Sequence, residues 1–222
     1  MGLDMYLERF PRYKYYTAED ICNVESYLEW LDDPEGQQHT LEDWCGVKQE
    51  QLPKAEDIEY FKRFMGTKYY AWDKDKKYPT NGIREHVAYW RKANAVHKWF
   101  VENVQDSEDD CDYHREVREE DLVKLRDICR RIIEETALIK GKVKNGYRFE
   151  KNKEVPIYED GLLVANPQLC NSLLPCTDGF FFGSTEYNEW YLDDIKYTYE
   201  VCNEILKETD FEKQMLFYRS SW

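Results

Sequence analysis

The residues with the clearest chemical potential are Gly183, Ser184 and Thr185, which follow three consecutive phenylalanines. A glycine lets the backbone turn sharply and approach a ligand closely. Either hydroxyl could cap a helix that the apolar spacing predicts over Tyr187–Lys207, and the free N–H groups of a first helical turn attract anions. We therefore predict a small-ligand site between a short buried strand, Phe180–Phe182, and this helix.

Acidic residues around the same segment support an alternative. Glu186 and Tyr187 complete the candidate site, but Glu186, Glu189, Asp193 and Asp194 place negative charge near the positive end of the helix dipole. These carboxylates would repel a phosphate. An ordinary capped helix is therefore the alternative to an anion site, and the chain contains no phosphate-binding loop of the G-x-x-x-x-G-K-S/T type.

A second candidate lies in Ile83–Val104, for which apolar residues at steps of three and four predict a long helix. Asn94 and His97 interrupt its apolar face. A buried amide or imidazole without a hydrogen-bond partner costs about 1–3 kcal/mol, so these side chains either brace a core network or line a pocket. Arg91 and Lys98 flank the face and could neutralise an anionic ligand.

The same segment offers two further kinds of chemistry. Trp90 and Trp99 could stack on a base or another ring, although large aromatic side chains serve a core equally well. Nucleophilic catalysis would need Ser184 or Cys176 to meet His97 in the folded chain, because the sequence has no G-x-S-x-G motif.

Metal binding has little support in the sequence. His86 and His97 are eleven residues apart, which corresponds to about 16 Å along a helix, so they could not share one metal ion. Cys111 and His114 lie in an acidic stretch but lack a second pair of ligands. We predict neither a metal nor a cofactor.

Composition limits the classes of partner. The 222 residues include 31 Lys and Arg against 45 Asp and Glu, a formal net charge of −14. A surface of this sign repels a phosphate backbone, which disfavours direct binding to nucleic acid. The charge favours a solvated acidic surface, or alternatively a surface that imitates nucleic acid and occupies the groove of a host protein.

Cysteine usage and hydropathy bear on the compartment. The seven cysteines are widely spaced and form no C-x-x-C pair, a pattern typical of reduced, intracellular proteins. The first ten residues carry charges where a signal peptide needs an apolar run, and no apolar stretch is long enough to span a membrane. We expect a protein of the cytoplasm that does not bind membranes.

The remaining elements predict an α+β fold, with a mostly antiparallel sheet packed by three long helices. Alternation predicts a first strand, and a last strand could neighbour it. A mixture of polar and β-branched residues with turn signals predicts a hairpin. Helical spacing predicts one helix capped by Thr17, one closed by Gly66 and a long one in the middle of the chain. We expect a single domain over 1–222, with an insertion or peripheral subregion over 32–82. The segments are, in order, Gly2–Phe10, Thr17–Leu31, Glu56–Met65, Lys68–Trp72, Glu119–Leu138, Gly141–Ala165 and Met215–Tyr218, with polar, turn-rich links over Asp32–Pro53 and Lys74–Gly82.

Three blocks together resemble an uncharacterised family of proteins carried by bacteriophages, prophages and their bacterial hosts. The blocks are MGLDMYL at the start of the chain, YWRKANAVHKWF (Tyr89–Phe100), and LLPCTDGFFFGSTEYNEWYLDDI (Leu173–Ile195). The resemblance implies a phage-type accessory protein in the bacterial cytoplasm. Many such proteins counter host defence, either by sequestering a nucleotide signal or by blocking a protein.

These observations favour a non-catalytic protein that binds a small polar or nucleotide-like ligand between the Trp90–Lys98 segment and the Gly183–Tyr187 turn. An acidic inhibitor of a host protein is one alternative. A hydrolase or phosphodiesterase with an unrecognised site is another. The aromatic content, 16% of the residues, would suit a homo-oligomer interface as well as a large core.

Overall fold

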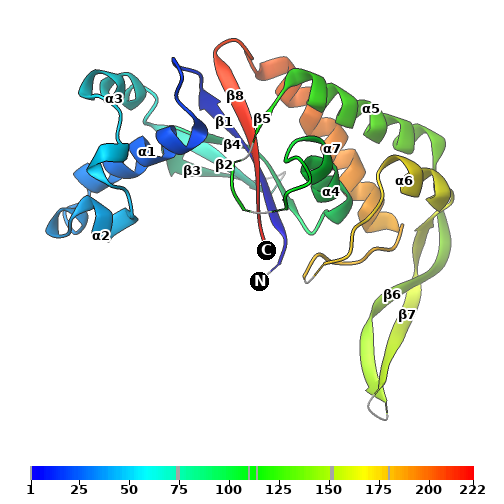
Figure 1. Cartoon of the computed structure of the whole chain (residues 1–222). Helices are drawn as coiled ribbons and strands as arrows, with labels where there is room; N and C mark the ends of the chain where they lie inside the picture. Colours follow the sequence, from blue (N-terminus) through cyan, green and yellow to red (C-terminus); the bar gives the residue numbers. More distant parts are fainter. Residues whose placement is uncertain (1, 74–75, 110, 114, 151–152, 180) are drawn as a thin grey trace.

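A computed structural model describes residues 2–73, 76–109, 111–113, 115–150, 153–179 and 181–222, and only the backbone over 67–81. It has an α+β fold (Figure 1). The elements are β1 (Asp4–Pro11), α1 (Ala18–Asp32), η1 (Gly36–Gln38), α2 (Leu41–Cys45), η2 (Gln49–Gln51), α3 (Ala55–Lys62), β2 (Thr67–Asp73), β3 (Lys76–Asn81), β4 (Glu85–Arg91), α4 (Asn94–Asn103), β5 (Glu116–Val117), α5 (Glu119–Glu135), β6 (Leu138–Glu150), β7 (Lys153–Val164), α6 (Pro167–Leu173), α7 (Glu189–Glu208) and β8 (Gln214–Ser221).

The central sheet has four antiparallel strands in the order β4-β1-β8-β5. The first and last strands of the chain are neighbours, as the sequence suggested, and pair from Asp4 opposite Ser221 to Pro11 opposite Gln214. Because successive strand residues point to opposite faces, Leu216 and Tyr218 pack on one side of β8, and Met215 and Phe217 pack on the other.

Helices cover the two faces of the sheet differently (Figure 1). The larger core lies against α4, α5 and α7, where Leu7, Phe100, Leu125 and Ile195 are fully buried. A smaller core joins the opposite face to α1 and α3 through Phe10, Ile21 and Phe61. Thr17 caps α1 with a reciprocal capping box, as predicted.

Strands β6 and β7 form a hairpin that projects from the body of the molecule (Figure 1). The prediction of a hairpin over Gly141–Ala165 is confirmed, but Gly146 and Gly161 lie within the strands rather than at the reversal. Gly146 has a φ of 94° and lies at a shift of register between Lys144 and Tyr147, where an inserted residue needs that conformation. The hairpin exposes Ile139, Tyr147, Phe149 and Tyr158.

The prediction of one helix over Ile83–Val104 is wrong, so only two of the three long helices expected are present. Glu85–Arg91 is strand β4, and α4 begins at Asn94. Val87–Trp90 is a short continuous run of apolar residues, which periodicity alone cannot assign to helix or strand, and pairing with β1 decides between them. Lys92, with a φ of 61°, separates the two elements.

Three shorter predictions also need correction. Asp32–Pro53 is not merely a loop, because it contains α2 and two 3₁₀ turns. Of the link Lys74–Gly82, residues 76–81 form strand β3, and residues 74 and 75 lie outside the described residues. Phe181 and Phe182 form no strand, since Phe181 has a φ of 73° and is exposed; Phe180 lies outside the described residues. No described helix is both long and apolar enough to cross a membrane.

Candidate functional site

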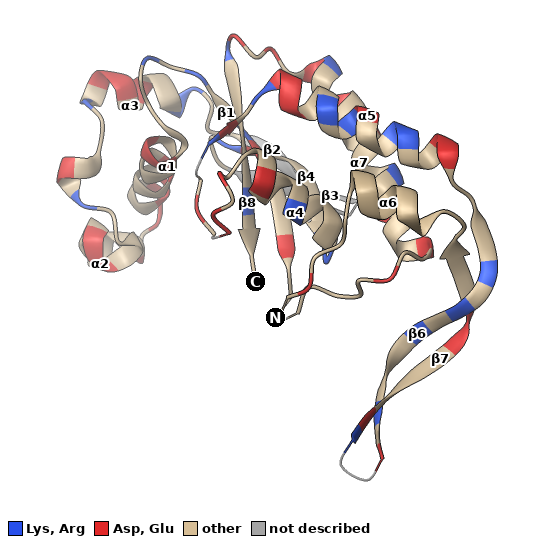
Figure 2. Ribbon diagram, turned by 45° about the vertical axis from the view of Figure 1, so that its right-hand side comes forward, with Lys and Arg blue, Asp and Glu red and all other residues tan. Residues whose placement is uncertain are grey.

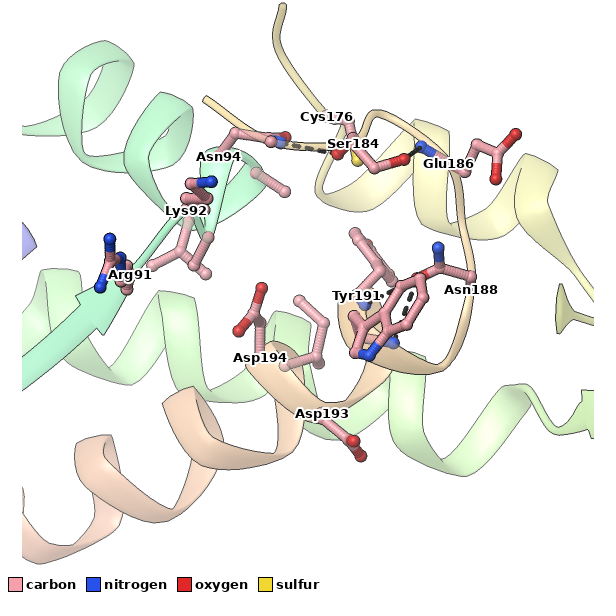
Figure 3. Close-up of a pocket in the computed structure, with 16 residues that line it drawn as sticks. Arg91, Lys92, Asn94, Cys176, Ser184, Glu186, Asn188, Tyr191, Asp193 and Asp194 are labelled. Atoms are coloured by element: carbon pink, nitrogen blue, oxygen red, sulfur yellow. Dashed lines mark hydrogen bonds between the residues drawn. The ribbon is translucent and has the colours of Figure 1, made fainter. Parts of the chain in front are cut away.

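A cavity of about 370 Å³ lies where the β4–α4 junction faces the beginning of α7 (Figure 3). The residues that line it come from three parts of the chain: Arg91–Val96, Cys176 with Gly183, Ser184 and Glu186, and Asn188, Trp190, Tyr191 and Asp193–Ile195. The two segments singled out in the sequence therefore meet at one concavity, although only part of each contributes.

Asn94 holds the loop that forms one wall of this cavity. Its side-chain amide donates hydrogen bonds to the carbonyl oxygens of Phe182 (3.1 Å) and Ser184 (2.8 Å), and its oxygen accepts one from the backbone N–H of Thr177 (3.2 Å). These bonds replace the strand pairing that was expected for the phenylalanine run. Asn94 is 4% exposed, so its interruption of the apolar face is a structural brace at the edge of the cavity.

The tight contact between the loop and the β4–α4 junction depends on glycine. Gly183 has a φ of 91°, and a Cβ at this position would lie 3.2 Å from the Cβ of Lys92. Glycine adopts this backbone conformation without the steric cost paid by other residues. The sequence predicted that Gly183 lets the backbone approach a ligand closely; in the structure it allows a close approach to the side chain and carbonyl oxygen of Lys92.

Asn188, rather than Ser184 or Thr185, caps α7. Its Oδ1 accepts hydrogen bonds from the backbone N–H groups of Trp190 (3.1 Å) and Tyr191 (3.2 Å). Two of the donors that an anion would use at this helix end are therefore occupied. Asn188 is 1% exposed, and its Nδ2 has no hydrogen-bond partner among the described residues. Figure 3 shows that nitrogen turned toward the Ser184–Glu186 side of the cavity.

Asp194 places a carboxyl group with a raised pKa in the cavity lining. Burial, with a further contribution from the charge of Asp193, raises its pKa to about 7. Figure 3 shows its carboxyl group pointing toward the space beside Lys92 and Tyr191, whereas Asp193 points away and lies 3.4 Å from Lys196. No ion pair formed by the described residues includes Asp194.

The basic residues of the lining stand at its rim. The Arg91 side chain is 61% exposed and lies 4.0 Å from a carboxylate oxygen of Asp4. Lys92 is also exposed. In Figure 3 neither cationic group is directed at Asp194. The cavity thus has two cations at its mouth and an uncompensated carboxyl group further in.

Cys176 is a poor candidate for a nucleophile. Burial raises the pKa of its thiol to about 12, and the neighbouring Cys170 and Asp194 add to the effect. The reactive form of cysteine is the thiolate, which is scarce at neutral pH under these conditions. His97 does not line the cavity with Cys176 or Ser184, so the nucleophile arrangements that the sequence left open are not assembled.

His97 belongs to a separate buried group. Its Nδ1 lies 2.7 Å from the hydroxyl oxygen of Tyr218, and its Nε2 lies 3.1 Å from a carboxylate oxygen of Asp109. Trp222 donates a hydrogen bond to the same carboxylate (3.1 Å). Burial lowers the pKa of His97, and Asp109 partly offsets this effect. His97 therefore fastens the Asp109 loop to β8.

Other predicted site residues lie around the cavity rather than in it. Trp90 is buried and donates to Thr198 (2.9 Å), and Lys98 lies 3.8 Å from Glu102. Thr185 is exposed and lines a neighbouring groove beside the hairpin. The Tyr187 hydroxyl donates to Asn171 (2.9 Å).

Glu186 joins the cavity to the hairpin. Its side chain accepts a hydrogen bond from the backbone N–H of Lys144 in β6 (3.0 Å).

Sequence reasoning missed Lys92, Asn188 and Asp194 as lining residues. The available signal for Asn188 was an asparagine, a favoured N-cap residue, at the second position of the predicted helix, whereas nothing local distinguishes Asp194 from Asp193.

Metal ligation has no geometric support within the described part of the chain, where no group of three His, Cys, Asp or Glu side chains could hold an ion. His114, considered above with Cys111, lies outside the described residues. All seven cysteines are unbridged.

No family model, curated protein or solved structure matches this chain.

Proposed function

We propose that the protein binds a small polar molecule, without chemical turnover, in the cavity between the β4–α4 junction and the start of α7. The proposal rests on two polar groups in the lining that have no hydrogen-bond partner among the described residues. Among the described residues, neither the Nδ2 of Asn188 nor the carboxyl group of Asp194 has a hydrogen-bond or ion-pair partner, and burying such groups costs free energy unless something pairs with them. A ligand would supply these partners.

The cavity fits this role in size and character. A volume of about 370 Å³ is within the range of small-ligand pockets, and its mixture of apolar side chains with a few polar groups is typical of them. The loop that encloses it is fixed by Asn94 and by Glu186. A pre-formed wall reduces the ordering cost of binding.

A thermal-shift screen against nucleotides, amino acids and amines tests the proposal, with two matched variants. Ser184→Trp places a large side chain at an exposed position of the lining, whereas Thr185→Trp makes the same change one residue outside it. We expect a compound to stabilise the wild type and Thr185→Trp but not Ser184→Trp. The proposal fails if no compound shifts the wild type, or if every shift survives in Ser184→Trp.

The resemblance to phage proteins gives this binding a biological setting. Within our proposal, sequestering a small signal molecule would counteract a host defence. Neither the burial of the Cys176 thiol nor the separation of His97 from the cavity favours a hydrolase or phosphodiesterase.

A second candidate function rests on the uneven distribution of charge. Residues 17–60, which we call the acidic lobe, contain 13 Asp and Glu against 2 Lys and Arg, and Figure 2 shows the acidic residues on α1, α2 and α3. This lobe would suit an inhibitor of a basic host protein. Capture of such a protein at low salt should weaken when Glu42, Asp43 and Glu50 are made neutral. Equal capture by this variant would contradict the candidate.

A further inference from the structure

The two cavity groups that have no partner among the described residues require opposite hydrogen-bonding groups on a ligand. The Asp194 carboxylate accepts hydrogen bonds and favours a positive charge, whereas the Nδ2 of Asn188 donates. The two residues are six positions apart at the start of α7, which corresponds to roughly 9 Å along the helix axis. A single small molecule could therefore meet both only with its donor and its acceptor at separate ends.

The apolar part of the lining lies close to both groups. Ala95, Val96 and Ile195 are buried, and Tyr191 and Trp190 contribute aromatic rings, of which the Trp190 side chain is 52% exposed. Aromatic faces attract organic cations as well as apolar chains. A carboxylate combined with tryptophan and tyrosine is a set of groups that suits an amine with a hydrocarbon body.

The same surroundings disfavour an anion deep in the cavity. Trp190 and Tyr191 have their backbone N–H groups capped by Asn188. Asp194 and Glu186 both line the cavity and would repel a phosphate or a carboxylate. The cations of the lining, Arg91 and Lys92, stand at the rim and are not directed at Asp194 (Figure 3).

We propose that the ligand of this cavity is an organic cation: its protonated nitrogen binds Asp194, and a neutral acceptor at its other end, such as an amide carbonyl, binds Asn188. This inference rests on the proposed function and specifies the class of ligand. It departs from the nucleotide-like ligand that the sequence suggested, because the donors needed for a phosphate are already used.

Two acetylated diamines serve as probes, each with a neutral analogue of the same shape. N-acetylputrescine is compared with N-pentylacetamide, and N-acetylcadaverine with N-hexylacetamide. Amide shifts in ¹H–¹⁵N spectra are followed up to roughly 10 mM, a concentration that reveals even ligands bound by only about 3 kcal/mol. The variants are Asp194→Asn, its neighbour Asp193→Asn as the matched control, and Asn188→Ser, which keeps a capping oxygen but removes the amide Nδ2.

We expect at least one diamine to shift signals around α7 and its neutral analogue to have no effect. Asp194→Asn should weaken this binding by about tenfold or more, Asn188→Ser by a smaller factor, and Asp193→Asn by less than Asp194→Asn, because the Asp193 carboxyl group points away from the cavity (Figure 3). Absence of binding by both diamines overturns the inference, as does equal binding by Asp194→Asn. If a nucleotide binds instead in a manner abolished by Ser184→Trp, the proposed function stands and the cationic ligand is refuted.

Discussion

Replacing Asp194 with asparagine should stabilise the protein at neutral and alkaline pH. The pKa of Asp194 is about 7 in the folded chain against an ordinary 3.8, so the folded state holds its proton more tightly than the unfolded state does. Below about pH 4 Asp194 is protonated in both the folded and the unfolded chain, so its ionisation does not change the free energy of unfolding. Between these two pKa values the unfolded chain ionises first, and the folded state progressively loses stability.

The size of the effect follows from the shift. The interval from 3.8 to about 7 corresponds to at most about 4 kcal/mol, and the partial exposure of the side chain reduces the expected value to about 2–3 kcal/mol. Asparagine keeps the shape and cannot ionise. For a chain of this length the gain would raise the melting temperature by roughly 5–10 °C at pH 8.

Melting temperatures of the wild type and Asp194→Asn, measured at intervals from pH 4 to pH 8.5, provide the assay. Among the charged groups near Asp194, Asp193 lies beside it, and Arg91, Lys92 and Glu186 line the same cavity. Asp193→Asn is therefore the control, with a much smaller change expected. A variant that gains nothing at pH 8, or gains equally at pH 4 and pH 8, would refute the reasoning.

Three further predictions concern the supports of the site. Asn94→Ala should lower the free energy of unfolding by about 2–4 kcal/mol, because two carbonyl oxygens and one N–H lose their partner; urea unfolding with Asn103→Ala as an exposed control measures this. Gly183→Ala should cost about 1–2 kcal/mol, since alanine adopts a φ of 91° with strain and would crowd Lys92, and an unchanged midpoint would contradict the loop geometry. Because burial lowers the pKa of His97, the unfolded chain takes up the proton first as the pH falls, so the free energy of unfolding should decline below about pH 6.5. His97→Gln should flatten that decline in a series of denaturation measurements at different pH. An unchanged slope would show that another group causes the decline.

Local patterns in the sequence were sufficient to predict the first and last strands of the chain, α1, α5, α7 and the hairpin. Alternation along Gly2–Phe10 and the cap at Thr17 are properties of neighbouring residues, and the structure keeps them. Glu85–Arg91 was mistaken for helix because its apolar residues form a short continuous run that periodicity cannot assign, and the strand is selected by β1, about eighty residues away in sequence.

The candidate site was predictable only in part, for a related reason. Asn94 attracted notice because an amide interrupted an apolar face, but its partners lie 83 to 90 residues further along the chain. Asp194 and Asp193 are both aspartates and are adjacent in the same helix. Only the packing of α7 against the β4–α4 junction buries one carboxyl group and leaves the other in solvent, and no local pattern encodes that difference.

The position of β8 between β1 and β5 has a consequence for synthesis on the ribosome. Strands β1 and β4 can pair early, but β5 has β8 as its only partner in the described sheet. Strand β8, buried on both faces, is translated after all the others. Both apolar faces of the sheet therefore stay incomplete until Met215–Tyr218 has emerged from the exit tunnel. Such late, long-range pairing slows folding and prolongs the exposure of an unpaired strand edge, so the yield of native protein should depend on chaperones that shield this edge during translation.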